Sequence, residues 1–139
     1  MKPLKLSYGF AGAFFWSHCG VLYAAAHVPM AQPKNVLGGH LISALIGVTV
    51  YRLWGLSWWT LALGVALAIG AMMVTDTLHP PGGATAFAAV FTQQNFSFVY
   101  KPVAIGVVIL MVIAIILHGV SGQKNIQIKI KGERTKFLR

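Results

Sequence analysis

The chain has 139 residues, of which 57% are hydrophobic and only 9% are charged, and its mean hydropathy is +0.72. This composition is typical of a protein whose solvent is lipid, and it excludes an ordinary water-soluble domain. A membrane-spanning helix needs about 20 mostly apolar residues, so the length predicts an all-α membrane protein with about four transmembrane helices. The single cysteine, Cys19, excludes an intrachain disulfide and argues against a cysteine-based metal site.

Hydrophobic segments follow one another along the chain. The first, residues 6–26, is interrupted by the more polar residues 17–20, so it either spans the membrane with a bend or is re-entrant. A second span is predicted over residues 35–54 and, after a short turn, a third over residues 58–74. The last span is predicted over residues 99–117.

Aromatic and basic side chains mark the turn between the second and third spans. Trp54, Trp58 and Trp59 suit an aromatic belt at a membrane–water interface. Arg52 is close enough to the same end to extend its guanidinium group to that interface.

The most informative stretch is residues 75–87, Thr-Asp-Thr-Leu-His-Pro-Pro-Gly-Gly-Ala-Thr-Ala-Phe. It places polar and helix-breaking residues directly after a membrane-length run, and a broken helix at membrane depth usually lines a path or a site. A short half-helix is predicted over residues 81–91, starting at Pro81, because proline suits the first helical position. Gly82 and Gly83 are expected to leave the adjacent backbone N–H groups uncovered.

The C-terminal residues 120–139 predict an orientation. Six lysines and arginines minus one glutamate give them five of the nine net positive charges, so we expect this basic tail in the cytoplasm and residues 1–119 as one transmembrane domain. With four spans, Lys34 and Lys101 then fall outside and Arg52 inside. Isoleucines alternate with polar residues in the tail, which fits either a strand-like segment or a disordered tail.

Two separated stretches carry a resemblance to a known family. Residues 29–48, Pro-Met-Ala-Gln-Pro-Lys-Asn-Val-Leu-Gly-Gly-His-Leu-Ile-Ser-Ala-Leu-Ile-Gly-Val, and residues 77–86, Thr-Leu-His-Pro-Pro-Gly-Gly-Ala-Thr-Ala, resemble the integral membrane HPP family, named after its His-Pro-Pro motif. The similarity covers about residues 15–119. Because chloroplast relatives in plants are associated with nitrite transport, the resemblance implies a transporter or channel for a small anion.

The chain departs from the family pattern at residues 17–20, Ser-His-Cys-Gly, where the family has a Gly-Ala-Ser-Ala-like stretch. These residues also resemble residues 83–86, and each stretch precedes an apolar run, a connector and a span. The similarity indicates either an internal repeat with two facing half-helices or a chance likeness among small residues.

Candidate site residues gather around the two motifs. His79 is expected to donate to an anion or carry a proton, with a helix cap or interhelical hydrogen bond as the alternative, and the same choice applies to His40. Asp76 is expected to cap a helix or to pair with His79 or a lysine. The predicted anion path comprises His79, Pro80, Pro81, Gly82, Gly83, Thr85, Gly38, Gly39, His40, Ser17 and His18. Its predicted polar support comprises Asn35, Thr75, Asp76 and Thr77.

Together these features predict a transporter or channel for a small inorganic anion such as nitrite, in which backbone N–H groups replace lost hydration. The alternative is a non-transporting membrane scaffold or accessory subunit. An enzyme is not expected, nor a metal, cofactor or nucleic-acid partner. We expect a homo-oligomer in a bacterial cytoplasmic membrane, with no cleaved leader. Close helix approach is expected at Gly38, Gly39, Gly47, Gly64, Gly70, Gly82, Gly83 and Gly106.

Overall fold

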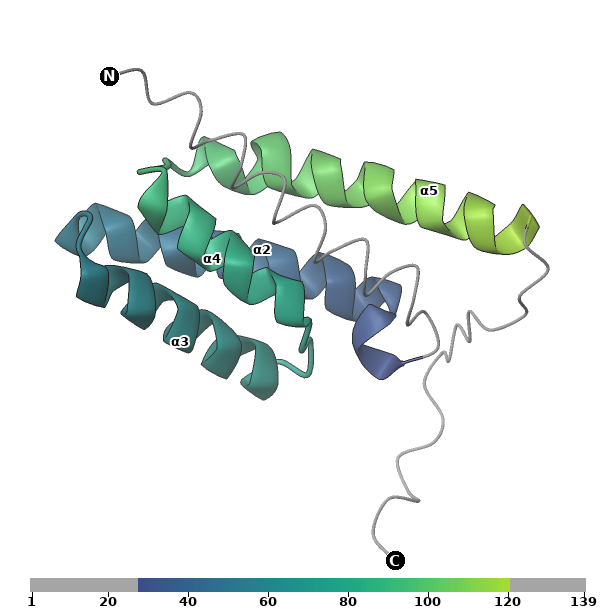
Figure 1. Ribbon diagram of the computed structural model, residues 1–139, viewed down its shortest axis with the longest axis horizontal. Helices are drawn as coiled ribbons and strands as arrows, with labels where there is room; N and C mark the ends of the chain where they lie inside the picture. Colours follow the sequence, from purple (N-terminus) through teal and green to yellow (C-terminus); the bar gives the residue numbers. More distant parts are fainter. Residues whose placement is uncertain (1–27, 121–139) are drawn as a thin grey trace, which may run out of the picture.

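The computed structural model describes the backbone of residues 28–120 and the side chains of residues 28–117. Every regular element in this part of the chain is helical, which confirms the all-α membrane fold (Figure 1). The expectations for residues 6–26 and for the basic tail lie outside the described residues. The elements are the 3-10 helix η2 (Pro29–Ala31), α2 (Pro33–Trp54), α3 (Trp58–Val74), α4 (Pro80–Phe91), the π-helical segment η3 (Val99–Ala104) and α5 (Ile105–Val120).

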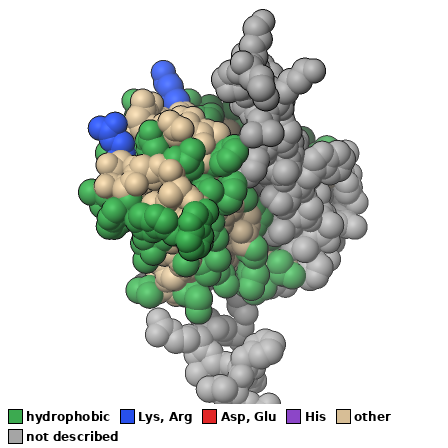
Figure 2. Space-filling model, turned by 60° about the vertical axis from the view of Figure 1, so that its left-hand side comes forward, with side chains coloured by type: hydrophobic (Ala, Val, Ile, Leu, Met, Phe, Trp, Pro, Cys, Tyr) green, Lys and Arg blue, Asp and Glu red, His purple; other side chains and the backbone are tan. Residues whose placement is uncertain are grey.

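Two described segments have the length and composition of membrane spans, namely Pro33–Trp54 and Val99–Leu117, while α3 is apolar but shorter, with 17 residues. The surface of this part of the chain is largely apolar, and Ile109 and Ile116 on α5 are each more than half exposed. Figure 2 shows hydrophobic side chains over most of the described face, with lysine and arginine side chains at one edge. Such a surface suits lipid acyl chains rather than water.

Helix α2 lies at the centre of the described bundle. It packs against α3 and α4 on one side and against η3 and α5 on the other, and α3 and α4 also pack against each other (Figure 1). The contact between α2 and α5 is a small aliphatic core. Its fully buried or nearly buried members are Val36, Ala44, Val103, Val107 and Ala114.

The turn between α2 and α3 contains residues that suit its backbone geometry. Gly55 has a positive φ of 72°, a conformation that glycine adopts without steric cost. Ser57 then caps α3: its hydroxyl accepts from the Thr60 N–H at 3.3 Å, and the Thr60 hydroxyl oxygen accepts from the Ser57 N–H at 2.9 Å. The ring centroids of Trp54 and Trp59 are 6.3 Å apart, so two of the tryptophans predicted for an aromatic belt contact each other at this end.

Helices α3 and α4 end in the same way, with a threonine followed by a residue in the left-handed conformation. The hydroxyls of Thr75 and Thr92 donate to carbonyls one turn earlier, at 2.8 and 2.6 Å. Asp76 and Gln93 follow with φ values of 57° and 56°, and the next N–H group in each case reaches back to a carbonyl five residues earlier. This is the Schellman arrangement, which satisfies the last carbonyls of a helix.

Helix α4 begins at Pro80, one residue before the predicted start at Pro81, so prolines occupy both of its first two positions. Neither position requires an N–H donor, which is why both prolines are tolerated. The break before α4 is recessed into the bundle rather than level with the start of α2. His79 at this break packs against Gly39, which is six residues after Pro33, or about 9 Å along the α2 axis.

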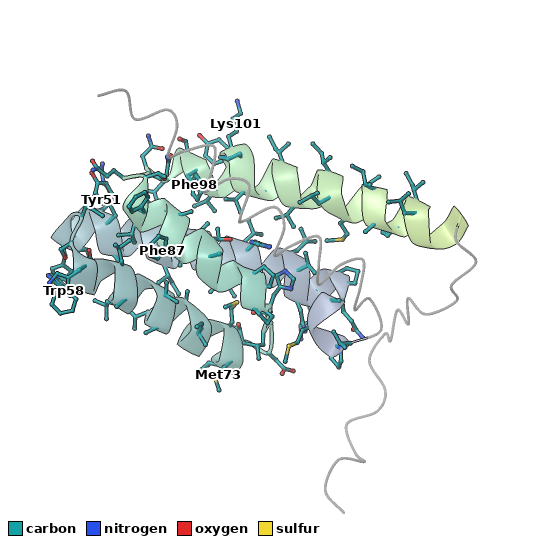
Figure 3. The ribbon with its side chains drawn as sticks, viewed as in Figure 1. Tyr51, Trp58, Met73, Phe87, Phe98 and Lys101 are labelled. Atoms are coloured by element: carbon teal, nitrogen blue, oxygen red, sulfur yellow. The ribbon has the colours of Figure 1, made fainter. Side chains whose placement is uncertain are left out.

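The direction of α4 corrects one prediction about sidedness. Helix α4 runs in the same direction as α2, and the Tyr51 hydroxyl donates to Gln93 Oε1 at 3.3 Å just past the end of α4. The chain has therefore returned towards the Arg52 end before α5 begins, and Figure 3 shows Lys101 pointing outward from the start of that segment. Lys101 and Lys34 thus lie towards opposite ends of the bundle, and α5 ends on the side where α2 begins. The reason is that α4, although short, carries the chain back along the bundle before α5 starts.

The segment before α5 is kinked. Lys101 has non-helical backbone angles, φ −124° and ψ 111°, because the residue before a proline is disfavoured in the helical region, and Pro102 follows it. The predicted span over residues 99–117 is therefore two pieces, a wide π-helical entry and a regular helix.

Candidate functional site

The structure brings the two predicted histidines together in the interface between α2 and α4. His40 on α2, His79 at the start of α4 and Thr85 on α4 each have 0% exposure. His40 Nδ1 and Thr85 Oγ1 are 2.6 Å apart, and the two imidazole rings meet edge to face with centroids 5.0 Å apart. Burying polar groups this fully costs free energy unless they are hydrogen-bonded, so these contacts are needed for the cluster to be stable in the fold.

The second anchor of the cluster is a backbone carbonyl. His79 Nδ1 lies 2.8 Å from the Met30 carbonyl oxygen in η2. Because a carbonyl oxygen only accepts, Nδ1 of His79 carries the hydrogen, and the neutral ring presents Nε2 as its acceptor. The histidine therefore ties the start of α4 to the short helix that precedes α2.

Glycines allow the backbones to approach closely enough for these contacts. A Cβ placed on Gly39 would lie 2.7 Å from the Cβ of His79, and one on Gly47 would lie 2.6 Å from the Ala86 carbonyl oxygen. On Gly38 it would lie 2.7 Å from a methyl carbon of Thr77. The expectation of close helix approach is confirmed at these positions.

Gly82 also confirms close helix approach, whereas other glycines correct the prediction. Gly82 donates its own N–H to the His79 carbonyl at 2.8 Å, and a Cβ on it would lie 3.0 Å from the Gly39 carbonyl oxygen, so it serves close packing rather than an uncovered N–H group. A Cβ on Gly83 would meet only ordinary contacts, the nearest at 3.7 Å. At Gly70 and Gly106 it would meet no described atom within 4 Å, so the described helices do not need a glycine there.

Two residues that the sequence did not single out complete the cluster. The Ser43 hydroxyl donates to Met72 Sδ at 3.6 Å, and both side chains have 0% exposure. Both surround Gly82, because a Cβ on that glycine would lie 2.9 Å from each of these two side-chain atoms. Ser43 lies three residues after His40 and so shares its helix face, which is the signal that could have identified it.

The predicted polar support has a structural role. Thr75 Oγ1 and Thr77 Oγ1 are 2.7 Å apart, and the Asn35 amide donates to the Pro29 carbonyl at 2.9 Å, which fixes η2 against α2. Asp76 pairs loosely with Lys34, at 3.9 Å, and its side chain is 98% exposed. Of the pairings expected for Asp76, the one with a lysine is therefore the one found. Ser17 and His18 lie outside the described residues.

Comparison with known proteins agrees with this motif arrangement. The model of the HPP transmembrane region matches residues 10–127, which is most of the chain and includes both stretches that form the cluster. The chain belongs to the HPP transmembrane family.

Relatives of this HPP protein are found in Dictyostelium discoideum. Two proteins described as transmembrane proteins are 32% and 30% identical to it over 113 residues, which is 76% of this chain in each case. The chain spans only 36% and 40% of the length of those relatives. No solved structure matches this HPP chain.

Proposed function

We propose that this HPP-family protein moves a small inorganic anion across a membrane, with nitrite as the first candidate. The observation that carries the proposal is the cluster of His40, His79 and Thr85, which is fully buried in an otherwise apolar membrane chain. Ionisable groups inside membrane proteins are costly and are usually retained for function. The cluster lies at a helix break, where membrane transporters place their substrate sites.

The geometry changes which donors would hold the anion. Pro80 and Pro81 have no N–H group, and the N–H of Gly82 already bonds to the His79 carbonyl. The donors that we propose for the anion are therefore side chains of the cluster, namely His40, Thr85 and a His79 ring protonated at Nε2, ahead of the backbone N–H groups expected from the sequence. The positive end of the α4 dipole adds to their attraction.

The tight packing also favours a carrier over an open pore. Gly47 and Gly82 bring α2 and α4 so close that a Cβ on either would lie within 3.0 Å of atoms of the neighbouring helices. Passage of an anion through this interface requires α4 to move away from α2. We therefore propose a carrier that alternates between conformations, with the tightly packed arrangement as its closed state.

The test is uptake of nitrite, nitrate, formate and chloride by liposomes that contain the purified protein, compared with protein-free liposomes. In Thr85→Val the shape of the side chain is kept and its hydroxyl is lost, so we expect nitrite uptake to fall about tenfold, the effect of roughly 1.4 kcal/mol of binding. Thr49→Val is the matched control, because the Thr49 hydroxyl only donates to the Leu45 carbonyl of its own helix.

One observation favours the scaffold alternative, namely that the same residues hold α2 and α4 in close contact. That alternative predicts no uptake of any of the four anions by well-folded wild-type protein. It also predicts that Thr85→Val changes the elution of the oligomer in size-exclusion chromatography. Uptake that is lost in Thr85→Val with unchanged elution would exclude it.

A further inference from the structure

The chain contains almost no acidic side chains to neutralise a buried positive charge. Its only two carboxylate residues are Asp76 and Glu133. The side chain of Asp76 is 98% exposed and faces Lys34, and Glu133 belongs to the C-terminal tail beyond the described residues. His40 and His79, in contrast, are fully buried. A proton taken up by either ring would therefore create a buried cation with no carboxylate beside it in the described part of the chain.

The described elements around the two rings carry few other titratable side chains, and these are at least partly exposed. From η2 comes the carbonyl of Met30, and from α3 the thioether of Met72, while the sequences of α3 and α4 contain no titratable residue. The charged and titratable side chains on the neighbouring elements are Lys34, Tyr51, Arg52, Tyr100 and Lys101, all at least partly exposed.

The hydrogen bonds show where a proton would go. His79 Nδ1 already carries a hydrogen, which it donates to the Met30 carbonyl, so an added proton binds at His79 Nε2. On His40, Nδ1 faces the Thr85 hydroxyl, which can either donate or accept, so this ring can adopt either tautomer. With ring centroids 5.0 Å apart, two positive charges would repel strongly, and the pair is suited to one proton rather than two.

A buried cation is stable only when it is paired with an opposite charge. We propose that the transported anion supplies this charge, so that the pair of His40 and His79 binds one proton together with one anion and the two cross the membrane as a neutral pair. This inference rests on the proposed transport function and specifies it as proton–anion symport. Linkage makes the effect reciprocal: the anion strengthens proton binding by the same factor by which the proton strengthens anion binding.

The first experiment measures the coupling directly. Liposomes that contain the wild-type protein and a trapped pH-sensitive dye are given nitrite on the outside, and protein-free liposomes provide the passive leak of nitrous acid. We expect one proton to enter with each nitrite and the rate to be independent of an imposed membrane potential. Above the pH at which the pair binds its proton, uptake should fall up to about tenfold per pH unit.

Two variants test the assignment to this pair. An asparagine side chain places an N–H donor near the position of Nδ1 but cannot bind a proton, so His79→Asn and His40→Asn keep the local hydrogen bonds and remove the titration. We expect coupled uptake to be lost in both. His118→Asn, which removes a histidine near the end of α5, should leave the coupling unchanged.

A second measurement does not depend on transport. In wild-type protein with 15N-labelled histidine, nitrite added at constant pH should increase the imidazolium signal, and this increase should be absent from His79→Asn and from His40→Asn. Nitrite uptake that carries one negative charge and no proton would overturn this inference and leave the transport function standing. Absence of uptake of all tested anions by folded protein would overturn the transport function itself.

Discussion

On the side of α2 that faces α4, the contacts are made by glycines and by polar side chains with 0% exposure, including His40 and Ser43. On the side that faces α5, they are made by aliphatic residues such as Val36 and Ala44. In lipid, apolar packing alone gives little preference for a protein neighbour over an acyl chain, whereas close backbone approach and interhelical hydrogen bonds are specific. The contacts with α4 therefore fix how the helices pack against α2, and the contact with α5 is less specific.

The largest effect should come from Gly47→Ala. Its new methyl group would meet the Ala86 carbonyl oxygen at 2.6 Å and the Ala86 Cα at 2.9 Å, and neither atom can rotate away. Overpacking of this kind costs about 1–3 kcal/mol or more, so we expect a clear fall in thermal unfolding temperature in detergent micelles.

Gly70→Ala is the matched control, because its methyl group meets no described atom within 4 Å and alanine is the better helix former by about 1 kcal/mol. If the two variants unfolded at the same temperature, the α2–α4 interface would not be the close contact described above.

A smaller effect is expected on the α5 side. Val107 is 3% exposed in the aliphatic core, and Val107→Ala removes two methyl groups from it. Because the vacated contacts can be replaced in part by lipid, we expect a loss of about 1 kcal/mol, at the low end for core truncations. Val108, with 48% exposure, provides the comparison. Equal losses in Val107→Ala and Val108→Ala, measured by denaturant titration in the same micelles, would argue that α5 does not pack on α2 in this register.

The smallest effect is expected at the loop between α3 and α4. The ion pair between Lys34 and Asp76 spans 3.9 Å, with both side chains largely exposed, and such pairs contribute little. We expect Lys34→Gln to unfold at the wild-type temperature at both low and high salt. A salt-dependent loss of stability in the variant would show that the recessed loop depends on this pair rather than on its contact with α2.

Much of the helix pattern could be predicted from residues that stop or start helices. Gly55 and Ser57 mark the turn between α2 and α3, and the prolines at positions 80 and 81 mark the start of α4 within one residue. The kink at Lys101 was missed, although Pro102 was a visible signal for it.

The site was predicted less completely, because its contacts join residues far apart in the chain. His40 and Thr85 are 45 positions apart, and no spacing pattern indicates that their side chains meet at 2.6 Å. Gly82 shows a second limit: a glycine after a proline fits either an uncovered N–H group or a close backbone contact, and only the position of Gly39 distinguishes them. In the sequence, Met72 does not differ from the other apolar residues of α3, and only the structure places its sulfur beside Ser43.

The direction of α5 has a consequence for the route of a solute. Since α5 ends on the side where α2 begins, the compartment at the C-terminal end of α5 is also the one nearest to the recessed break with His79. If the tail is cytoplasmic, as its charge predicts, the histidine pair lies closer to the cytoplasm than to the outside. Under the proposed transport function, a solute entering from the cytoplasm would then meet the proposed proton-binding pair at the start of its passage, whereas one arriving from outside would meet it only near the end.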